Sequence, residues 1–169
     1  MSSKLRVDSI LPVDGAPTNG GGGIIQIVTG STQTATAQNF STDSFADTGL
    51  TASITPKFST SKILVTGYVS WYIALGGNGS AEWNFAVCDG SNNILDGTTA
   101  LAGGYRFNES YQLAGKHPIN FLHSPSTTSA FTYKIRMNAK NANQSGNVNC
   151  QKDSQANNIS RITLMEVSA

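Results

Sequence analysis

Apolar and polar side chains alternate with a period of two along much of this chain, and that pattern most limits what it can fold into. The clearest stretch is 131–140, where every second residue is apolar and the residues between are polar. The apolar positions are Phe131, Tyr133, Ile135, Met137 and Ala139, opposite Thr132, Lys134, Arg136, Asn138 and Lys140. Side chains alternate across a strand, so the stretch predicts a β-strand with one wet face.

A second long alternation covers residues 62–75, and both of its faces carry large side chains. Ile63, Val65 and Val69 share one face with Trp71 and Ile73, while the other face is made of Leu64, Thr66, Tyr68, Ser70 and Tyr72. A strand that is bulky on both sides needs cover on both sides. We therefore expect a central strand, or one that touches a partner.

Weaker alternations predict further strands, and no window shows the apolar stripe of an amphipathic helix. The additional strands are expected at 24–36, 49–55, 81–88, 111–122, 147–152 and 159–167. Turn-forming residues separate them at 75–79, 89–93 and 141–146. About eight short strands at this spacing predict an all-β fold, an antiparallel β-sandwich of jelly-roll-like type.

Composition narrows the range of partners. Of the 169 residues 38% are hydrophobic and only 12% are charged, with a net charge of +1. This predicts one core and a surface of hydroxyl, amide and glycine groups. No run of basic residues supports binding to nucleic acid or to an anionic membrane. No apolar segment is long enough to form a transmembrane helix. The N-terminus also lacks the features of a signal peptide, so we expect synthesis in the cytoplasm.

Four consecutive glycines, Gly20 to Gly23, divide the chain into two parts. Glycine runs lose much backbone entropy on ordering, which is typical of a flexible joint. We therefore assign residues 1–23 to an N-terminal arm with its joint and residues 24–169 to a β-sandwich head.

The arm alternates like a strand but is too short to fold alone. Leu5 and Val7 alternate with charged residues, and Ile10 and Leu11 precede a proline that ends the pattern. Such a segment binds by adding a strand to the edge of a partner's sheet or by lying in a groove. The residues predicted to anchor the protein are Lys4, Leu5, Val7, Ile10 and Leu11.

A sandwich leaves strand edges exposed, and proteins pair, charge or cover such edges. Self-association is one way to cover them, and the two-sided strand at 62–75 offers a place for it. We expect a homo-oligomer on this ground, without a subunit number.

Residues of catalytic type are present but do not form a known motif. His117 and His123 fit no zinc-binding spacing, and the sequence has no nucleophile elbow, phosphate loop or calcium loop. Cys88 and Cys150 match no metal-ligand spacing, and we expect two buried free thiols. Structural roles are also expected where His123 adjoins Ser124 and Cys150 adjoins Gln151, and for Glu82, Asp89, Asp96 and Glu109. The sequence thus predicts no catalytic residue, no cofactor and no metal site, and a protein that is not an enzyme.

Aromatic residues raise a separate possibility, a platform on which a sugar ring stacks. Trp71, Tyr72, Trp83, Tyr105, Phe107 and Tyr111 belong to this set. Trp71 and Trp83 lie on alternating patterns and are expected in the core. Residues 105–108 follow two glycines in an expected loop, so the candidate receptor contacts are Asn78, Tyr105, Arg106 and Asn108.

Four short segments carry a resemblance to a known family. They are residues 3–10 (SKLRVDSI), 45–56 (FADTGLTASITP), 59–65 (STSKILV) and 162–167 (ITLMEV). These segments resemble virion fibre proteins of tailed bacteriophages, and the similarity is strongest to those of cyanobacterial and marine phages. The resemblance implies a trimeric β-sandwich head, an N-terminal strand that docks into the particle, and a location in the virion.

The expected function is that of a tail or baseplate fibre. In this hypothesis the arm docks on other virion proteins while the polar loops of the head meet the host surface, where a glycan is one possible ligand. Three alternatives remain: a capsid decoration or head-fibre protein, a non-catalytic carbohydrate-binding module, and an esterase or glycosidase.

Overall fold

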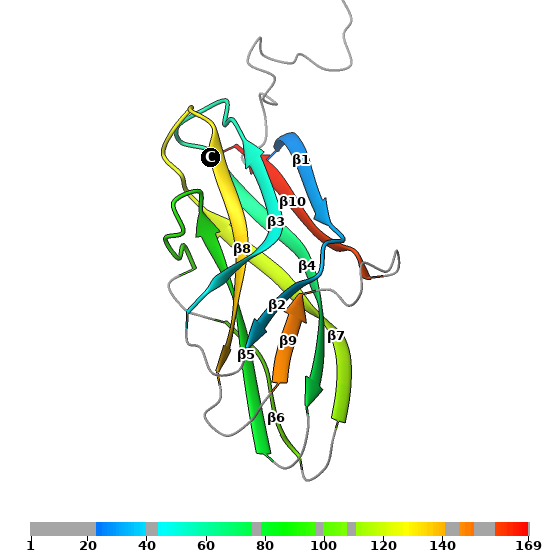
Figure 1. Cartoon of the computed structure of the whole chain (residues 1–169). Helices are drawn as coiled ribbons and strands as arrows, with labels where there is room; N and C mark the ends of the chain where they lie inside the picture. The colour runs from blue at the N-terminus through cyan, green and yellow to red at the C-terminus, as the bar shows by residue number, and fades with distance from the viewer. Residues whose placement is uncertain are drawn as a thin grey trace, which may run out of the picture.

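The computed structural model describes residues 23–39, 44–75, 79–96, 100–107, 111–140, 146–150 and 158–168. These residues form two antiparallel sheets packed face to face (Figure 1). The strands are β1 (Ile24–Thr32), β2 (Thr36–Asn39), β3 (Ala46–Ile54), β4 (Lys62–Leu75), β5 (Gly79–Asp89), β6 (Ala100–Phe107), β7 (Tyr111–His123), β8 (Phe131–Lys140), β9 (Gly146–Cys150) and β10 (Ser160–Val167). The predicted fold class, an antiparallel β-sandwich, is confirmed.

The larger sheet, here called the β4 sheet, is organised around its longest strand. On one side β4 pairs with β10 over its first half and with β9 over its second half. β1 then pairs with β10, and β2 with β9. On the other side β7 pairs along nearly the whole of β4, from Ile63 opposite His123 to Leu75 opposite Tyr111. The prediction of a central strand at 62–75 is therefore confirmed.

The smaller sheet, here called the β8 sheet, has the order β3, β8, β5, β6. Its strand β8 has the bounds predicted from the alternation. Tyr133, Ile135, Met137 and Ala139 are buried on the inner face, as expected. Asn138 departs from the prediction of a wet outer face. It is buried and accepts a hydrogen bond from the Asn84 side chain at 2.8 Å, so each buried amide has a partner on the neighbouring strand.

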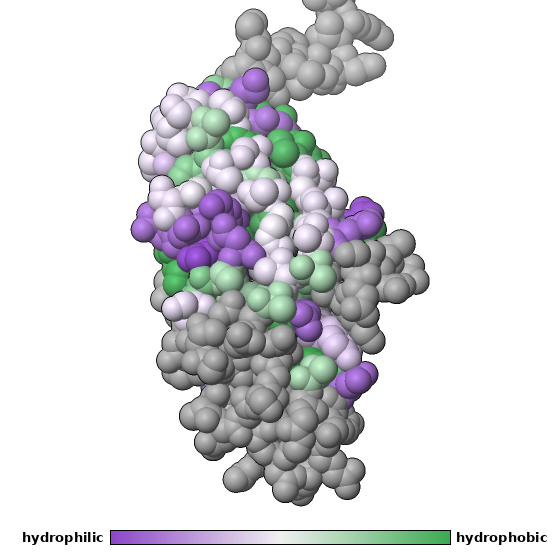
Figure 2. All heavy atoms as spheres, viewed as in Figure 1, coloured by the Kyte–Doolittle hydropathy of each residue, from purple (hydrophilic) through white to green (hydrophobic). Residues whose placement is uncertain are grey.

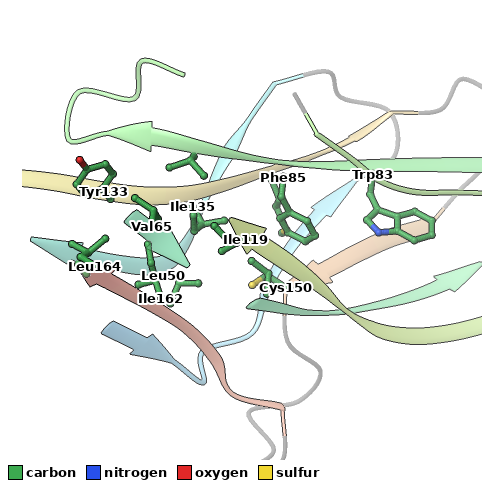
Figure 3. Close-up of a cluster of buried hydrophobic side chains, with 14 of the residues drawn as sticks. Leu50, Val65, Trp83, Phe85, Ile119, Tyr133, Ile135, Cys150, Ile162 and Leu164 are labelled. Atoms are coloured by element: carbon green, nitrogen blue, oxygen red, sulfur yellow. The ribbon is translucent and has the colours of Figure 1, made fainter. Parts of the chain in front are cut away.

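The core lies between the sheets and draws on both (Figure 3). Ile162 and Leu164 of β10 meet Leu50 of β3 and Tyr133 of β8, and all four are almost fully buried. Phe85 and Trp83 of β5 extend the core toward its other end. Trp83 is buried and Trp71 half-buried, with ring centroids 4.8 Å apart, so the expected core role of these tryptophans is confirmed.

Two strands were not predicted. β2 is a four-residue strand that begins at Thr36, the last residue of the strand expected at 24–36, and β1 itself ends at Thr32. β6 occupies 100–107, where Gly103 and Gly104 had indicated a loop. That prediction was wrong, and Tyr105 and Arg106 lie on a strand paired with β5. The glycine-rich sequence of β6 does not favour a strand by itself, and β6 is stabilised by its hydrogen bonds to β5.

The outer surface agrees with the composition. Among the coloured residues, Figure 2 shows many that are pale and weakly polar, one large hydrophilic cluster, and smaller hydrophilic groups elsewhere. On the outer face of the β8 sheet, Asp47 pairs with Arg136 at 2.8 Å and with Lys134 at 3.5 Å, and Lys134 also reaches Asn92. No helix in the described part of the chain is long and apolar enough to cross a bilayer.

Candidate functional site

The end of the head from which the arm leaves is one structural unit, which we call the arm-proximal end. The carbonyl of Gly23 accepts a hydrogen bond from Ser168 N at 3.0 Å, and Ile24 pairs with Val167. Val167 of β10 and the following Ser168 therefore hold Ile24 and Gly23, the residues at which the arm joins the head. Beside it lies the connection from β3 to β4, residues 55–61.

Glu166 ties the arm-proximal end together from within. Its side chain is fully buried and accepts hydrogen bonds from Gln26 Nε2 at 2.5 Å, Lys57 N at 2.7 Å and Phe58 N at 3.3 Å. Burial raises the pKa of this carboxyl, but the hydrogen bonds from Gln26 and the two backbone amides outweigh burial and hold the pKa below its ordinary value. An ionised carboxylate thus joins β1, β10 and the β3–β4 connection.

The opposite, distal end contains the candidate receptor contacts as far as they are described. Tyr105 and Arg106 lie near the end of β6, where Phe107 pairs with Gly79. Asn78 and Asn108 fall outside the described residues, each next in sequence to one member of that pair. The predicted anchoring residues Lys4, Leu5, Val7, Ile10 and Leu11 also fall outside the described residues.

A groove of about 320 Å³ opens along one long side of the sandwich, between β7 and β5; we call it the β7 groove. Its apolar lining comes from both sheets, and polar groups lie on its walls. It is lined by Phe85, Ala86, Val87, Asp96, His117, Pro118, Ile119, Asn120, Phe121 and Ile135. Concave, mostly apolar surfaces with a few polar groups are typical of binding sites.

The histidines of β7 are packed among aromatic rings. His117 lies 5.4 Å from the Phe85 ring, and burial lowers its pKa. His123 Nδ1 is 2.9 Å from the Tyr133 hydroxyl, and its ring stacks on Phe121 at 5.9 Å. Burial lowers the pKa of His123 and raises that of Tyr133. Both histidines are thus held neutral at physiological pH, and His123 orders the buried Tyr133 hydroxyl.

The two cysteines are buried free thiols. Burial raises the pKa of Cys150 to about 11, and Cys150 Sγ is 4.0 Å from Ser160 Oγ. Burial likewise raises the pKa of Cys88. A protonated, enclosed thiol is a poor nucleophile, so the contacts at Cys88 and Cys150 are those of core residues.

The acidic residues have differing surroundings. Asp89 caps a turn by accepting hydrogen bonds from Ser91 N and Asn93 N, both at 2.8 Å, and these contacts, with the Asn93 side chain first, lower its pKa. The structural role expected of Asp89 is confirmed. Glu82 is exposed, Asp96 lines the β7 groove and Glu109 is outside the described residues. Within the described ranges, no group of three or more His, Cys, Asp and Glu side chains could hold a metal ion.

Sequence reasoning missed the β7 groove and the role of Glu166. The available signal for the groove is Pro118, because proline inside a strand pattern indicates an edge strand. Glu166 gives no comparable signal, since a single acidic residue near the end of an alternating segment looks like any solvated side chain.

Comparisons with known proteins give only low-scoring structural alignments. No protein-family profile matches the chain, and no curated protein matches its sequence. Among solved structures, the Gt strain of infectious bursal disease virus aligns with a TM-score of 0.43 and 9% identity, over 97% of this chain and 42% of that one.

Two further structures from the same virus give similar values. A mutant VP2 protein in T=1 particles aligns with a TM-score of 0.43 and 10% identity, over 97% of this chain and 40% of the other. The T13 viral particle aligns with a TM-score of 0.40 and 10% identity, over 85% of this chain and 35% of the other. The chain spans less than half the length of each of these structures.

Proposed function

We propose that this chain is a structural, non-enzymatic protein of a virion, most specifically a tail or baseplate fibre of a tailed phage. In this proposal the arm attaches the protein to the particle and the distal end of the head meets the host. A homotrimer is the assembly that the resemblance to phage fibres implies.

One observation carries the proposal: three of the four fibre-like segments, the neighbouring 45–56 and 59–65 and the distant 162–167, meet at the arm-proximal end. Residues 45–56 contain β3, residues 59–65 begin β4, and residues 162–167 make up most of β10. β10 pairs with the first half of β4, and Glu166 holds the amides of Lys57 and Phe58. The similarity to fibre proteins is therefore concentrated where the arm joins the head.

The point at which the arm joins the head and the candidate receptor contacts lie at opposite ends of the sandwich. The arm leaves beside Ile24, while the candidate contacts Tyr105 and Arg106 lie near the Gly79–Phe107 pair at the distal end (Figure 1). A protein anchored at one end and exposed at the other suits attachment to a surface.

Deleting residues 1–19 tests the anchoring role. The expected product is a folded, soluble head that no longer joins particles, because the strand that docks has been removed while the described fold begins at Gly23. Circular dichroism and thermal unfolding of the purified truncation provide the control for folding. Normal incorporation of a folded truncation would contradict the proposal.

Labelling intact particles tests the location. A tag at the C-terminus, imaged by electron microscopy, is expected on the tail or baseplate. Label spread over the capsid would replace the fibre assignment with that of a decoration protein.

Binding of purified head to host cells, lost on substitution of Arg106 by Ala, is expected for an attachment protein.

A further inference from the structure

The long edge of β7 lacks a partner strand within the described parts of the chain, where β7 pairs with β4 alone. Exposed edges of this length are normally paired or covered, because their N–H and C=O groups can bind another strand. The β7 groove lies directly along this edge.

The hydrogen-bonding groups of β7 that face outward can be identified from its neighbour. Ser70 N donates to Ser160 Oγ at 2.9 Å, so the even-numbered residues of β4 turn their backbone groups toward β10. The odd-numbered residues of β4 then bond to β7, and Val69 lies opposite His117. Backbone groups of Lys116, Asn120 and Leu122 therefore point away from the sheet.

Pro118 fits this pattern. It lies among the same outward-facing positions, and proline is accommodated in an edge strand when its missing N–H faces away from the neighbour. The edge keeps its other donors and all its carbonyls. A strand added beside β7 would place alternate side chains over the apolar part of the groove, formed by Phe85, Ile119, Phe121 and Ile135.

The chain itself contains a segment with the required pattern. In residues 4–11 two aliphatic side chains, Leu5 and Val7, alternate with charged ones, two of them positive, and the carboxylate of Asp96 lines the groove. We propose that residues 4–11 of a neighbouring copy add as an antiparallel strand to the edge of β7, with Leu5 and Val7 in the β7 groove.

Direction favours a neighbouring copy over the chain's own arm. Ile24 lies opposite Val167, and Val167 opposite Lys62, so the arm leaves at the end of the sheet where β7 finishes at His123. Three strand spacings, about 14 Å, separate β1 from β7. If the chain's own arm took the shortest route across them, Leu11 would lie beside the C-terminal end of β7, and the arm would run parallel to β7. Every ladder described in this fold is antiparallel, and an arm from another copy is free to pair that way.

The linker is long enough for such an exchange. Residues 12–22 separate the segment from the head, and extended chain spans up to about 3.3–3.6 Å per residue, or about 36–40 Å here. Two copies that exchange arms reciprocally form a closed dimer, whereas exchange in one direction closes into a larger ring or continues as a filament. The inference rests on the proposed function only in treating the arm as the docking segment, and an arm that is paired with β7 of a neighbouring copy is not bound to another virion protein at the same time.

The first test compares the oligomeric state of the purified full chain with two double variants, by light scattering coupled to size exclusion. The wild type is expected to be an oligomer. Leu5→Asp with Val7→Asp is expected to be a monomer with an unchanged circular dichroism spectrum, because neither residue belongs to the described strands of the sandwich. Thr18→Asp with Asn19→Asp makes the same charge change elsewhere in the arm and is expected to remain oligomeric. A monomeric wild type, or an oligomer indifferent to Leu5 and Val7, would overturn the inference.

The second test identifies which copy supplies the strand. Arg6→Cys and Asn120→Cys are made on separate chains that carry different tags, mixed, and treated with a short thiol cross-linker. Cys88 and Cys150 are fully buried, so the introduced cysteines are the reactive ones. A cross-link between differently tagged chains is expected. Linkage found only within a chain carrying both changes would overturn the neighbouring-copy assignment.

The two proposals can fail separately. If the purified chain is monomeric while particles still require residues 1–19, the inference fails and the anchoring function stands. If the arm-dependent oligomer forms but particles take up the truncated protein, the anchoring function fails and the inference stands.

Discussion

Along one long side of the sandwich the sheets meet at β1 and β3, and along the other β7 and β5 stay apart. At the meeting point Gly30 lies so near β3 that an added Cβ would be 2.1 Å from the Thr51 carbonyl oxygen. On the opposite side the β7 groove separates the sheets, and Leu122 on β7 is 54% exposed. One side is closed by backbone packing within the chain, whereas the other leaves apolar surface and backbone groups available to a partner.

The largest expected effect is a difference in core packing between the two sides. Ile162→Ala on the closed side should lower the free energy of unfolding by about 2–5 kcal/mol, because the side chain is fully buried. Phe121→Ala on the open side should cost less than the roughly 3–5 kcal/mol typical of a buried phenylalanine, since Phe121 is half-buried. Urea denaturation measures both. An equal or larger loss at Phe121 would show that the open side is packed as firmly as the closed one.

The closed side depends on the absence of a side chain at Gly30. Gly30→Ala should destabilise the protein by about 1–3 kcal/mol, because its methyl group cannot fit against the Thr51 carbonyl without a backbone shift. Gly90→Ala is the matched control, since its Cβ would meet Thr132 at an ordinary 3.4 Å. Thermal unfolding of the two variants separates them. Equal melting temperatures would mean that β1 and β3 are not in firm contact.

Glu166, at the arm-proximal end, makes the free energy of unfolding sensitive to acid. Glu166→Gln should cost about 1–3 kcal/mol at neutral pH, because an amide cannot accept all the hydrogen bonds of the carboxylate. The folded pKa is lowered, so the stabilisation is fully present above the unfolded pKa and is lost as the pH falls through the folded pKa. Urea denaturation across the acidic range should show a flatter profile for the variant. A wild-type profile as flat as the variant's would argue against an ionised Glu166.

The hydrogen bond between His123 and Tyr133 contributes less. Tyr133→Phe should lower stability by about 1 kcal/mol, because it removes one buried hydroxyl and leaves His123 Nδ1 without that contact. Chemical denaturation at pH 7 measures the change. A stabilised variant would mean that the burial cost of the hydroxyl exceeds the value of its hydrogen bond.

The smallest effect is expected at Leu122, on the outer face of β7. Leu122→Ser should change the free energy of unfolding by no more than about 0.5 kcal/mol, because more than half of the side chain is already exposed. The measurement uses the Leu5→Asp, Val7→Asp background, in which the proposed strand exchange is removed. A loss well above this size would show that Leu122 is covered within a single copy.

The long alternating segments were predictable because burial on one face selects their register. β4 and β8 have the predicted bounds, and the apolar face of β8 is buried as expected. β6 was not predictable from its own residues, because its glycines and small side chains form a strand only when β5 supplies the ladder. Asn138 was misassigned for a similar reason, since its burial depends on Asn84 of another strand.

By itself, the sequence determined that the chain would form strands, that residues 62–75 would be a central strand or one that touches a partner, and that the candidate catalytic residues match no known motif. Hydrophobic periodicity and residue spacing are local properties, so they can be read in order along the chain. Only the tertiary structure decided that one side of the sandwich closes at Gly30 while the other opens into a groove. It also decided that Glu166 joins β1, β10 and the β3–β4 connection at the arm-proximal end. Those features depend on distances between strands remote in sequence, and no local pattern encodes such distances.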